Sequence, residues 1–201
     1  MSDPSVSMRS GSTRGWASLA IVLLSGALAP AMADETAAFD AGTGFRIARF
    51  RAPVNHPPPG GQRISIDEID RLVASETVVL LDVMPAEGGG PDPVGGEWRL
   101  VRTRDNIPGS VWLADVGRGE LSPGMDRYFR DGLQRLTGGD MSRAIVVYCQ
   151  SDCWMAWNAV KRASSYGYSR LYWYPEGTDG WRDNDRAVVS ARPVPVAPPA
   201  D

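Results

Sequence analysis

The chain of 201 residues contains only two cysteines and one histidine, and these low counts exclude several classes of site. Cys149 and Cys153 lie four positions apart, so they cannot form the long-range disulfide framework of a small secreted domain. A structural zinc site normally takes four nitrogen or sulfur ligands, and the single histidine, His56, is remote in sequence. Covalent haem attachment needs a histidine directly after the second cysteine, where this chain has Trp154. The sequence therefore predicts neither a metal nor a haem site.

No segment concentrates positive charge. The formal net charge is −3 at pH 7, and lysine and arginine form no block that could neutralise a run of phosphates. We therefore expect no nucleic-acid partner.

No apolar segment is long enough to cross a bilayer. The run Ala17–Leu28 has 12 residues, fewer than the ~20 that span a membrane. It follows Arg14 and precedes an Ala-x-Ala sequence ending at Ala33, a pattern typical of a secretory signal peptide. We predict that residues 1–33 are cleaved on export and that the mature protein has no membrane segment. An uncleaved anchor is the alternative.

The remainder is expected to form one domain with two flanking segments. Residues 34–63 are an N-terminal extension, in which Phe45–Phe50 alternates apolar and basic residues as an edge strand does. Residues 64–191 form the domain. Residues 192–201 contain four prolines and are expected to trail in extended form as a Pro-rich tail.

Helices and strands alternate within the domain. Capping and termination signals predict three helices: from a Ser65/Glu68 capping box to about Ala74, from Ser122-Pro123 to Gly138, and from the cysteine segment to Gly167. Apolar runs predict four strands: Val78–Val83, Val111–Leu113, Ala144–Tyr148 and Leu171–Tyr174. The glycine- and proline-rich segment Met84–Asn106 is expected to be a long loop. The predicted fold is α/β, with a central, mainly parallel sheet of about five strands and helices on both faces.

The two cysteines lie at a strand-to-helix turn. Ligands bind at the carboxyl ends of strands in an open parallel sheet, and Cys149 ends the strand Ala144–Tyr148. The first N–H groups of the following helix stabilise negative charge and lower the pKa of a nearby thiol. We therefore expect Cys149 to be the more nucleophilic cysteine.

The chain from Ile64 to Trp181 resembles a rhodanese-type domain. The matching segments, in chain order, are Ile64–Glu68, Leu80–Val83, Ile107–Ser110, Ile145–Cys149, Gly167-Tyr168, Leu171-Tyr172 and Gly177…Trp181. Their order and spacing together are more specific than any one of them. The resemblance implies a rhodanese-like fold.

The resemblance also implies a role for the active-site loop. In such domains the cysteine carries a persulfide, and the backbone N–H groups of the loop converge on it. Here those groups would come from Gln150, Ser151, Asp152, Cys153 and Trp154. The chain departs from the pattern, because Trp154 stands where a cation commonly closes the loop and Asp152 adds a negative charge. Both changes disfavour an anionic donor such as thiosulfate.

The string Cys149-Gln-Ser-Asp-Cys153-Trp154 is similar to the Cys-x-x-x-Cys-Trp signature of a narrower family. Those proteins are exported rhodanese-like companions of PQQ-dependent alcohol catabolism. The similarity implies a periplasmic location and partnership with a quinoprotein alcohol dehydrogenase or a c-type cytochrome. The spacing itself gives no indication of PQQ binding.

The curl of the loop predicts proximity of its two cysteines. Their Cα atoms are expected within the ~4.4–6.8 Å that a disulfide requires. We expect Cys149 to attack a sulfur or disulfide substrate and Cys153 to resolve the adduct. The alternatives are an inert or purely structural pair, and a catalytically inactive module that docks a quinoprotein, a cytochrome or a small redox cofactor.

Other residues have structural and functional interpretations. Trp154 and Trp157 share a helix face, where packing is favoured over an aromatic pocket. Asp82 interrupts an apolar strand and is expected to be buried in a supporting role with hydrogen-bond partners. His56 is expected in a solvated loop. Three residues that border the long loop are expected at the solvated surface, although they could cover the cysteine face: Trp98, Arg99 and Arg102.

Overall fold

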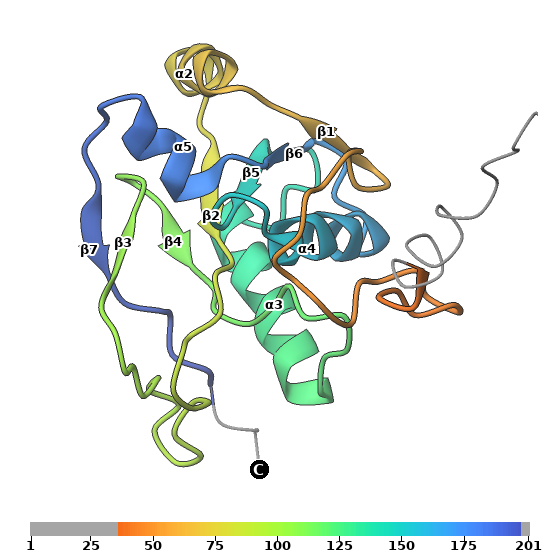
Figure 1. Cartoon of the computed structure of the whole chain (residues 1–201). Coiled ribbons are helices and arrows are strands. Elements are labelled where there is room, and N and C mark those ends of the chain that lie inside the picture. Colours follow the sequence, from red (N-terminus) through yellow and green to blue (C-terminus); the bar gives the residue numbers. More distant parts are fainter. Residues whose placement is uncertain (1–35, 198–201) are drawn as a thin grey trace, which may run out of the picture.

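A five-stranded parallel sheet forms the centre of the molecule (Figure 1). The computed structural model describes residues 36–197, so the predicted signal peptide lies outside the described residues. The strands, in their spatial order, are β1 (Gly61–Arg63), β6 (Leu171–Tyr174), β5 (Ile145–Tyr148), β2 (Val79–Asp82) and β4 (Val111–Trp112). The predicted fold class is confirmed. Within the described part of the chain, no helix has the length and apolarity needed to cross a membrane.

The central strands are held by burial on both faces. All four residues of β5 are buried, as expected for the continuous apolar run Ile145–Tyr148. Its register pairs Asp82 of β2 with Tyr148 of β5. The residues that follow these two strands therefore emerge side by side at one edge of the sheet.

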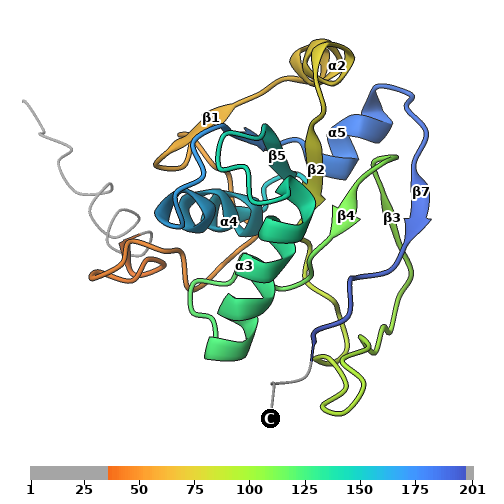
Figure 2. The ribbon, with the colours of Figure 1, turned by 180° about the vertical axis from the view of Figure 1, so that it is seen from behind.

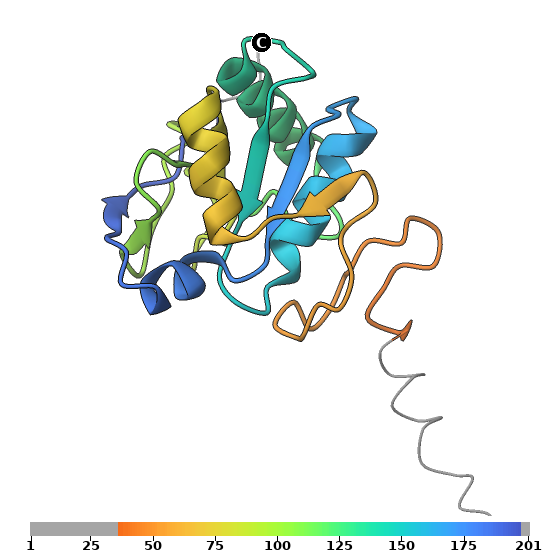
Figure 3. The same cartoon turned by 90° about the horizontal axis from the view of Figure 1, so that it is seen from above.

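Helices cover both faces of the sheet (Figure 3). One face carries α3 (Pro123–Thr137) and α4 (Trp154–Ser165), and the other carries α2 (Ile66–Ser75) and α5 (Gly177–Asp183). The predicted capping box of α2 is present, with Glu68 N–H donating to Ser65 Oγ and Ser65 N–H donating to the Glu68 carboxylate. The predictions for α2, α3 and α4 are confirmed, with boundaries within one or two residues.

The predicted edge strand Phe45–Phe50 is wrong. Arg46 makes one isolated bridge with Phe39, and the edge of the sheet is instead β1, which directly follows Pro57-Pro58-Pro59-Gly60. The extension pairs with the cysteine loop: Arg51 forms an isolated antiparallel bridge with Cys153, and Ala52 N–H donates to Asp152 O. The alternating pattern failed because this segment pairs with a loop rather than with a strand.

A separate antiparallel ribbon was not predicted. It joins β3 (Arg104–Asn106), at the end of the expected long loop, to β7 (Val189–Ala191) beside the main sheet (Figures 1 and 2).

The described part of the tail also departs from expectation, because it packs against the domain instead of trailing away. Val194 N–H donates to Trp112 O, and Val194 O accepts hydrogen bonds from Trp98 Nε1 and Tyr128 Oη. Residues 198–201 lie outside the described part of the chain.

Candidate functional site

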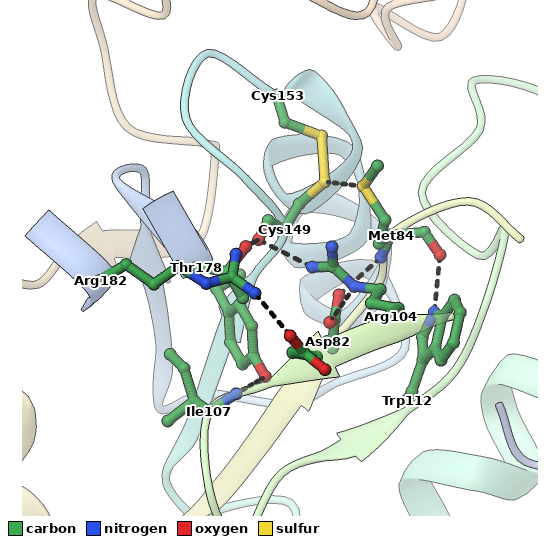
Figure 4. A network of polar contacts seen from close by, with 11 residues as sticks. Asp82, Met84, Arg104, Ile107, Trp112, Cys149, Cys153, Thr178 and Arg182 are labelled. Atoms are coloured by element: carbon green, nitrogen blue, oxygen red, sulfur yellow. Dashed lines mark hydrogen bonds and ion pairs between the residues drawn. A yellow bond between two sulfur atoms is a disulfide. The ribbon is translucent and has the colours of Figure 1, made fainter. Parts of the chain in front are cut away.

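Cys149 and Cys153 are joined as a disulfide in the loop between β5 and α4 (Figure 4). Their Cα atoms are 6.2 Å apart, inside the range predicted from the curl of the loop. Only 1% of Cys149 and 5% of Cys153 is exposed. Cys153 is also the N-cap residue of α4, although its side chain makes no capping hydrogen bond.

The backbone of Cys149 is fixed by three donors. Its carbonyl oxygen accepts hydrogen bonds from Thr178 N–H at 3.1 Å, Thr178 Oγ1 at 3.2 Å and Arg104 Nη2 at 3.1 Å. Thr178 lies in the first turn of α5, which Gly177 brings very close: a Cβ atom on Gly177 would lie 2.6 Å from Cys149 O. The loop is therefore anchored at its first residue by the start of α5 and by the β3–β7 ribbon.

Asp82 is the buried anchor of Arg104. The Asp82 side chain is fully buried, and its carboxylate accepts hydrogen bonds from Arg104 Nε at 2.6 Å and from Met84 N–H at 2.8 Å. Burial raises the pKa of Asp82 to about 6, and the ion pair with Arg104 opposes that rise. Asp82 is therefore mostly ionised at neutral pH. Its burial and its hydrogen-bond partners confirm the structural expectation.

Met84 places a third sulfur beside the disulfide. Its Sδ lies 3.3 Å from Cys149 Sγ, and Figure 4 shows the sulfur atoms of Cys153, Cys149 and Met84 in succession. The backbone of Met84 is held at both ends, because its N–H donates to Asp82 and its carbonyl oxygen accepts from Trp112 Nε1 at 2.7 Å. The thioether is thus positioned by the end of β2.

The N–H groups of the loop do not all converge on Cys149. Ser151 N–H donates to Asp179 Oδ2 at 3.1 Å, and Trp154 N–H donates to Phe50 O at 2.9 Å. For these two of the five expected donors, the arrangement implied by the resemblance is wrong. The physical reason is that α5 and the N-terminal extension supply acceptors on the outer side of the loop.

Trp154 and Trp157 pack as predicted from their spacing. They are 2% and 3% exposed, and their ring centroids are 5.2 Å apart. Phe39 and His56 complete an aromatic cluster with them, with the Phe39 ring 5.1 Å from that of Trp154. His56 is exposed, as expected, although its ring contacts both tryptophans. This aromatic cluster packs at the end of the cysteine loop that faces the N-terminal extension.

A cavity of about 270 Å³ lies on the other side of the loop. Its lining includes Met84, whose Sδ contacts Cys149 Sγ, and Gln150, the residue after Cys149. Three arginines and two acids contribute the charged lining: Arg102, Arg104, Arg182, Glu87 and Asp105. The sequence pattern suggested that no cation serves the loop. This expectation is wrong, because arginines from the long loop, the ribbon and α5 surround the cavity.

Three other residues singled out in the sequence, Asp152, Trp98 and Arg99, do not line this cavity. Asp152 is exposed and lines a different cavity, of about 170 Å³, with Arg63 and Glu176, so its charge does not face the one beside Met84. Trp98 is 4% exposed and packs in the core, which corrects the expectation of a solvated side chain. Arg99 and Arg102 are exposed, as expected.

Two contributors to the site were missed from the sequence. Met84 and Arg104 lie at the two ends of the segment expected to be a long loop. A signal for Met84 existed in the parallel register, because it follows β2 and Cys149 follows the neighbouring β5. Arg104 had no comparable signal, since its position depends on pairing with the distant β7.

The parallel sheet and the loop after β5 define an α/β domain with a cysteine pair at the end of its central strand. A family model described as a rhodanese-like domain matches residues 65–184. The chain therefore belongs to the rhodanese-like domain family.

Solved structures of similar fold include three sulfur-transfer proteins. The polysulfide-sulfur transferase homodimer of Wolinella succinogenes is 17% identical, with a TM-score of 0.41 and coverage of 65% of this chain and 80% of that chain. The 3-mercaptopyruvate sulfotransferase of Escherichia coli is 17% identical, with a TM-score of 0.47 and coverage of 70% and 54%. The thiosulfate sulfurtransferase of Pseudomonas aeruginosa is 12% identical, with a TM-score of 0.48 and coverage of 71% and 22%. A search of curated proteins finds no match.

Proposed function

We propose that this rhodanese-like protein performs thiol–disulfide or sulfur-relay chemistry and that Cys149 and Cys153 are its reacting pair. The observation that carries the proposal is the placement of both sulfurs in the loop after central strand β5, within bonding distance. Arg104 beside Cys149 supports Cys149 as the nucleophile, because a nearby cation favours a thiolate. Cys153, at the start of α4, is then the resolving residue.

The proposed cycle starts from the reduced pair. The Cys149 thiolate attacks one sulfur of a substrate disulfide, forms a mixed disulfide and releases the other half of the substrate as a thiolate. With a persulfide or polysulfide donor, the same attack leaves the transferred sulfur on Cys149 as a persulfide. Cys153 then attacks Cys149 Sγ, closes the internal disulfide and releases the remaining thiolate or hydrosulfide. A dithiol returns two electrons and two protons and is itself oxidised to a disulfide.

The cavity beside Met84 and Gln150 is the proposed entry for the substrate. It has a volume of about 270 Å³ and is lined by three arginines and two acids. These charges suit a small anionic or zwitterionic sulfur compound. Because Met84 lines this cavity with its Sδ 3.3 Å from Cys149 Sγ, the thioether must shift when a substrate sulfur approaches from this side.

The proposed setting is the periplasm, beside PQQ-dependent alcohol oxidation. Two sequence features support it: the secretory pattern of residues 1–33 and the Cys149-x-x-x-Cys153-Trp154 string. The proposed partners are a quinoprotein alcohol dehydrogenase, which would carry the PQQ, or a c-type cytochrome. Cell fractionation and the N-terminal sequence of the native protein test export, and growth of a deletion strain on an alcohol tests the pathway.

Trapping of the adduct tests the chemistry. After reduction, Cys153→Ser is expected to accumulate a mixed disulfide or persulfide on Cys149, because the resolving thiol is missing. Cys149→Ser is expected to accumulate neither. Mass spectrometry of both variants and of the wild type, before and after reductant, reads out the adducts. Equal trapping in the two variants, or two slowly reacting thiols in the isolated native protein, would overturn the proposal.

The burial of both sulfurs favours a second candidate function. In this alternative the disulfide is structural, and the protein is a catalytically inactive module that docks a quinoprotein, a cytochrome or a small redox cofactor. Growth on an alcohol and capture of the partner by both serine variants would favour docking. Loss of growth with retention of capture would favour chemistry.

A further inference from the structure

Three sulfur atoms meet at one point of the structure. Cys149 Sγ is bonded to Cys153 Sγ and lies 3.3 Å from Met84 Sδ. The thioether comes from the end of β2, whereas both cysteines belong to the loop after β5. Sulfur-transfer chemistry needs only the two cysteines, so the proposed function leaves the third sulfur without a role.

The chemistry of this set selects a soft metal ion. Thiolate and thioether sulfurs are the ligands that favour Cu(I). Zinc normally takes four nitrogen or sulfur ligands, and among residues 36–197 no group of three or more histidine, cysteine, aspartate or glutamate side chains could hold a metal. Two thiolates and one thioether are thus too few for a typical zinc site but match the preference of Cu(I).

We propose that the reduced protein binds one Cu(I) ion between the sulfurs of Cys149, Cys153 and Met84. The proposal rests on the proposed function in one respect, namely that the cysteine pair can be reduced. The disulfide form is then the state that cannot bind copper, and reduction creates the site.

The geometry requires only local movement. Metal–sulfur bonds of about 2.3 Å, as in zinc thiolates, place the sulfurs of a trigonal site about 4 Å from one another. Met84 Sδ is already 3.3 Å from Cys149 Sγ, and opening the disulfide frees Cys153 Sγ to move away from Cys149 Sγ. The backbone of Met84 stays fixed by Asp82 and Trp112, which makes the thioether a preorganised ligand.

The surroundings suit a monovalent ion held by two thiolates. The complex carries one net negative charge, and the guanidinium of Arg104 lies against the carbonyl of Cys149. The low exposure of both cysteines keeps water from the metal. Both features favour the reduced ion over Cu(II), which prefers nitrogen and oxygen ligands in tetragonal geometry.

The binding reaction balances without an oxidant. A phosphine or dithiol first reduces the disulfide to two thiols, taking up the oxidising equivalents itself. The two thiols then exchange their protons for one Cu(I), forming two copper–thiolate bonds and one copper–thioether bond and releasing two protons.

Competition with a colorimetric Cu(I) chelator under anaerobic conditions tests the site. We expect the reduced wild type to remove one copper per chain from the chelator and the disulfide form to remove none. Even outer-shell partners of a metal are worth about 10- to 100-fold in affinity. Met84→Leu is therefore expected to weaken Cu(I) binding by at least about tenfold while leaving the number of reactive thiols unchanged. Met125→Leu is the matched control, because Met125 is also half-buried but lies on α3 and lines another cavity.

X-ray absorption of the copper-loaded wild type gives a second measurement, which does not depend on the folding of a variant. Three sulfur neighbours support the site, whereas two sulfurs, or a copper shared between two chains, overturn it. Wild-type affinity in folded Met84→Leu also overturns it. If the pair exchanges with dithiols but takes no copper, the inference fails and the proposed function stands. If copper binds but no adduct forms on Cys149, the proposed function fails and the copper site stands.

Discussion

Arg104 Nη2 donates a hydrogen bond of 3.1 Å to the carbonyl oxygen of Cys149, although the two residues lie 45 positions apart in the chain. The same guanidinium is held by the buried carboxylate of Asp82 through its Nε. A cation is therefore fixed beside the candidate nucleophile by a residue that does not itself touch the thiol. The positive charge of Arg104 favours a thiolate on Cys149, whereas the negative charge of Asp82 opposes one.

Replacement of Arg104 by methionine should slow the reaction of the reduced Cys149. Loss of the cation, with Asp82 left in place, disfavours the thiolate of reduced Cys149, so its reaction should slow by up to about tenfold near neutral pH. The rate of alkylation of Cys149 at pH 7, followed by mass spectrometry, measures the effect. Arg102→Met is the matched control, since Arg102 lines the same cavity but is exposed. An unchanged alkylation rate in folded Arg104→Met would contradict the assignment.

The pKa of Asp82 predicts a pH dependence of stability. Burial raises this pKa to about 6 from the ordinary value of 3.8, so the folded protein binds the proton more tightly than the unfolded chain. The stabilisation that comes from tighter proton binding by Asp82 in the folded protein is fully present below about pH 4 and is lost as the pH rises through about 6. The free energy of unfolding of the wild type, relative to that of Asp82→Asn, should fall by up to about 3 kcal/mol between pH 4 and pH 7.

Urea titrations at a series of pH values measure this change. Asp92 supplies a control of opposite sign, because hydrogen bonds from Gly95 and Val94 and the contact with Arg99 lower its pKa to about 2. The Asp92 carboxylate titrates below pH 4, so the free energy of unfolding of Asp92→Asn should follow the same pH dependence as that of the wild type between pH 4 and pH 7. A flat difference between wild type and Asp82→Asn would show that the carboxylate does not titrate in this range.

Local signals were sufficient for the central sheet and its helices. The capping box at Ser65 and the Pro123 start of α3 encode helix boundaries within a few residues of sequence. The buried run Ile145–Tyr148 encodes a central strand, and its end locates Cys149. These features are predictable because the residues that form each element are close together in the chain.

The features that could not be predicted from the sequence depend on pairing between segments that are distant in the chain. Arg104 reaches Cys149 only because β3 pairs with β7, near the other end of the domain. The contact of the extension with the loop likewise depends on backbone bridges from Arg51 and Ala52, which no side-chain pattern records. The positive charge at the cavity cannot be predicted from the cysteine loop, because residues 149–153 contain no lysine or arginine.

Gly177 provides a direct test of the packing behind Cys149. Its φ is +55°, and a Cβ atom there would lie 2.6 Å from Cys149 O, whereas Gly109 has a φ of +81° with no atom within 4 Å of such a Cβ. Both Gly→Ala changes incur the cost of a positive φ, about 1 kcal/mol. Gly177→Ala should be less stable than Gly109→Ala by a further 1–3 kcal/mol or so, because the collision overpacks the site. It should also change the rate at which a dithiol reduces the disulfide. Equal stability of the two variants in urea would show that the loop yields freely.

The C-terminal segment after β7 is expected to stabilise the domain. Removal of residues 192–201 takes away Val194 O, which accepts hydrogen bonds from the buried Trp98 and Tyr128, and Val194 N–H, which donates to Trp112 O. An unsatisfied buried donor costs about 1–3 kcal/mol, so truncation after Ala191 should lower the free energy of unfolding by about 2–5 kcal/mol. Urea unfolding followed by tryptophan fluorescence measures the loss.

Tyr128→Phe should cost about 1 kcal/mol in the full chain but less in the truncated chain, because the acceptor of the tyrosine hydroxyl is already gone. Strict additivity of the two changes would mean that Tyr128 and Val194 are not coupled, and the segment would then stabilise the domain through its other contacts alone.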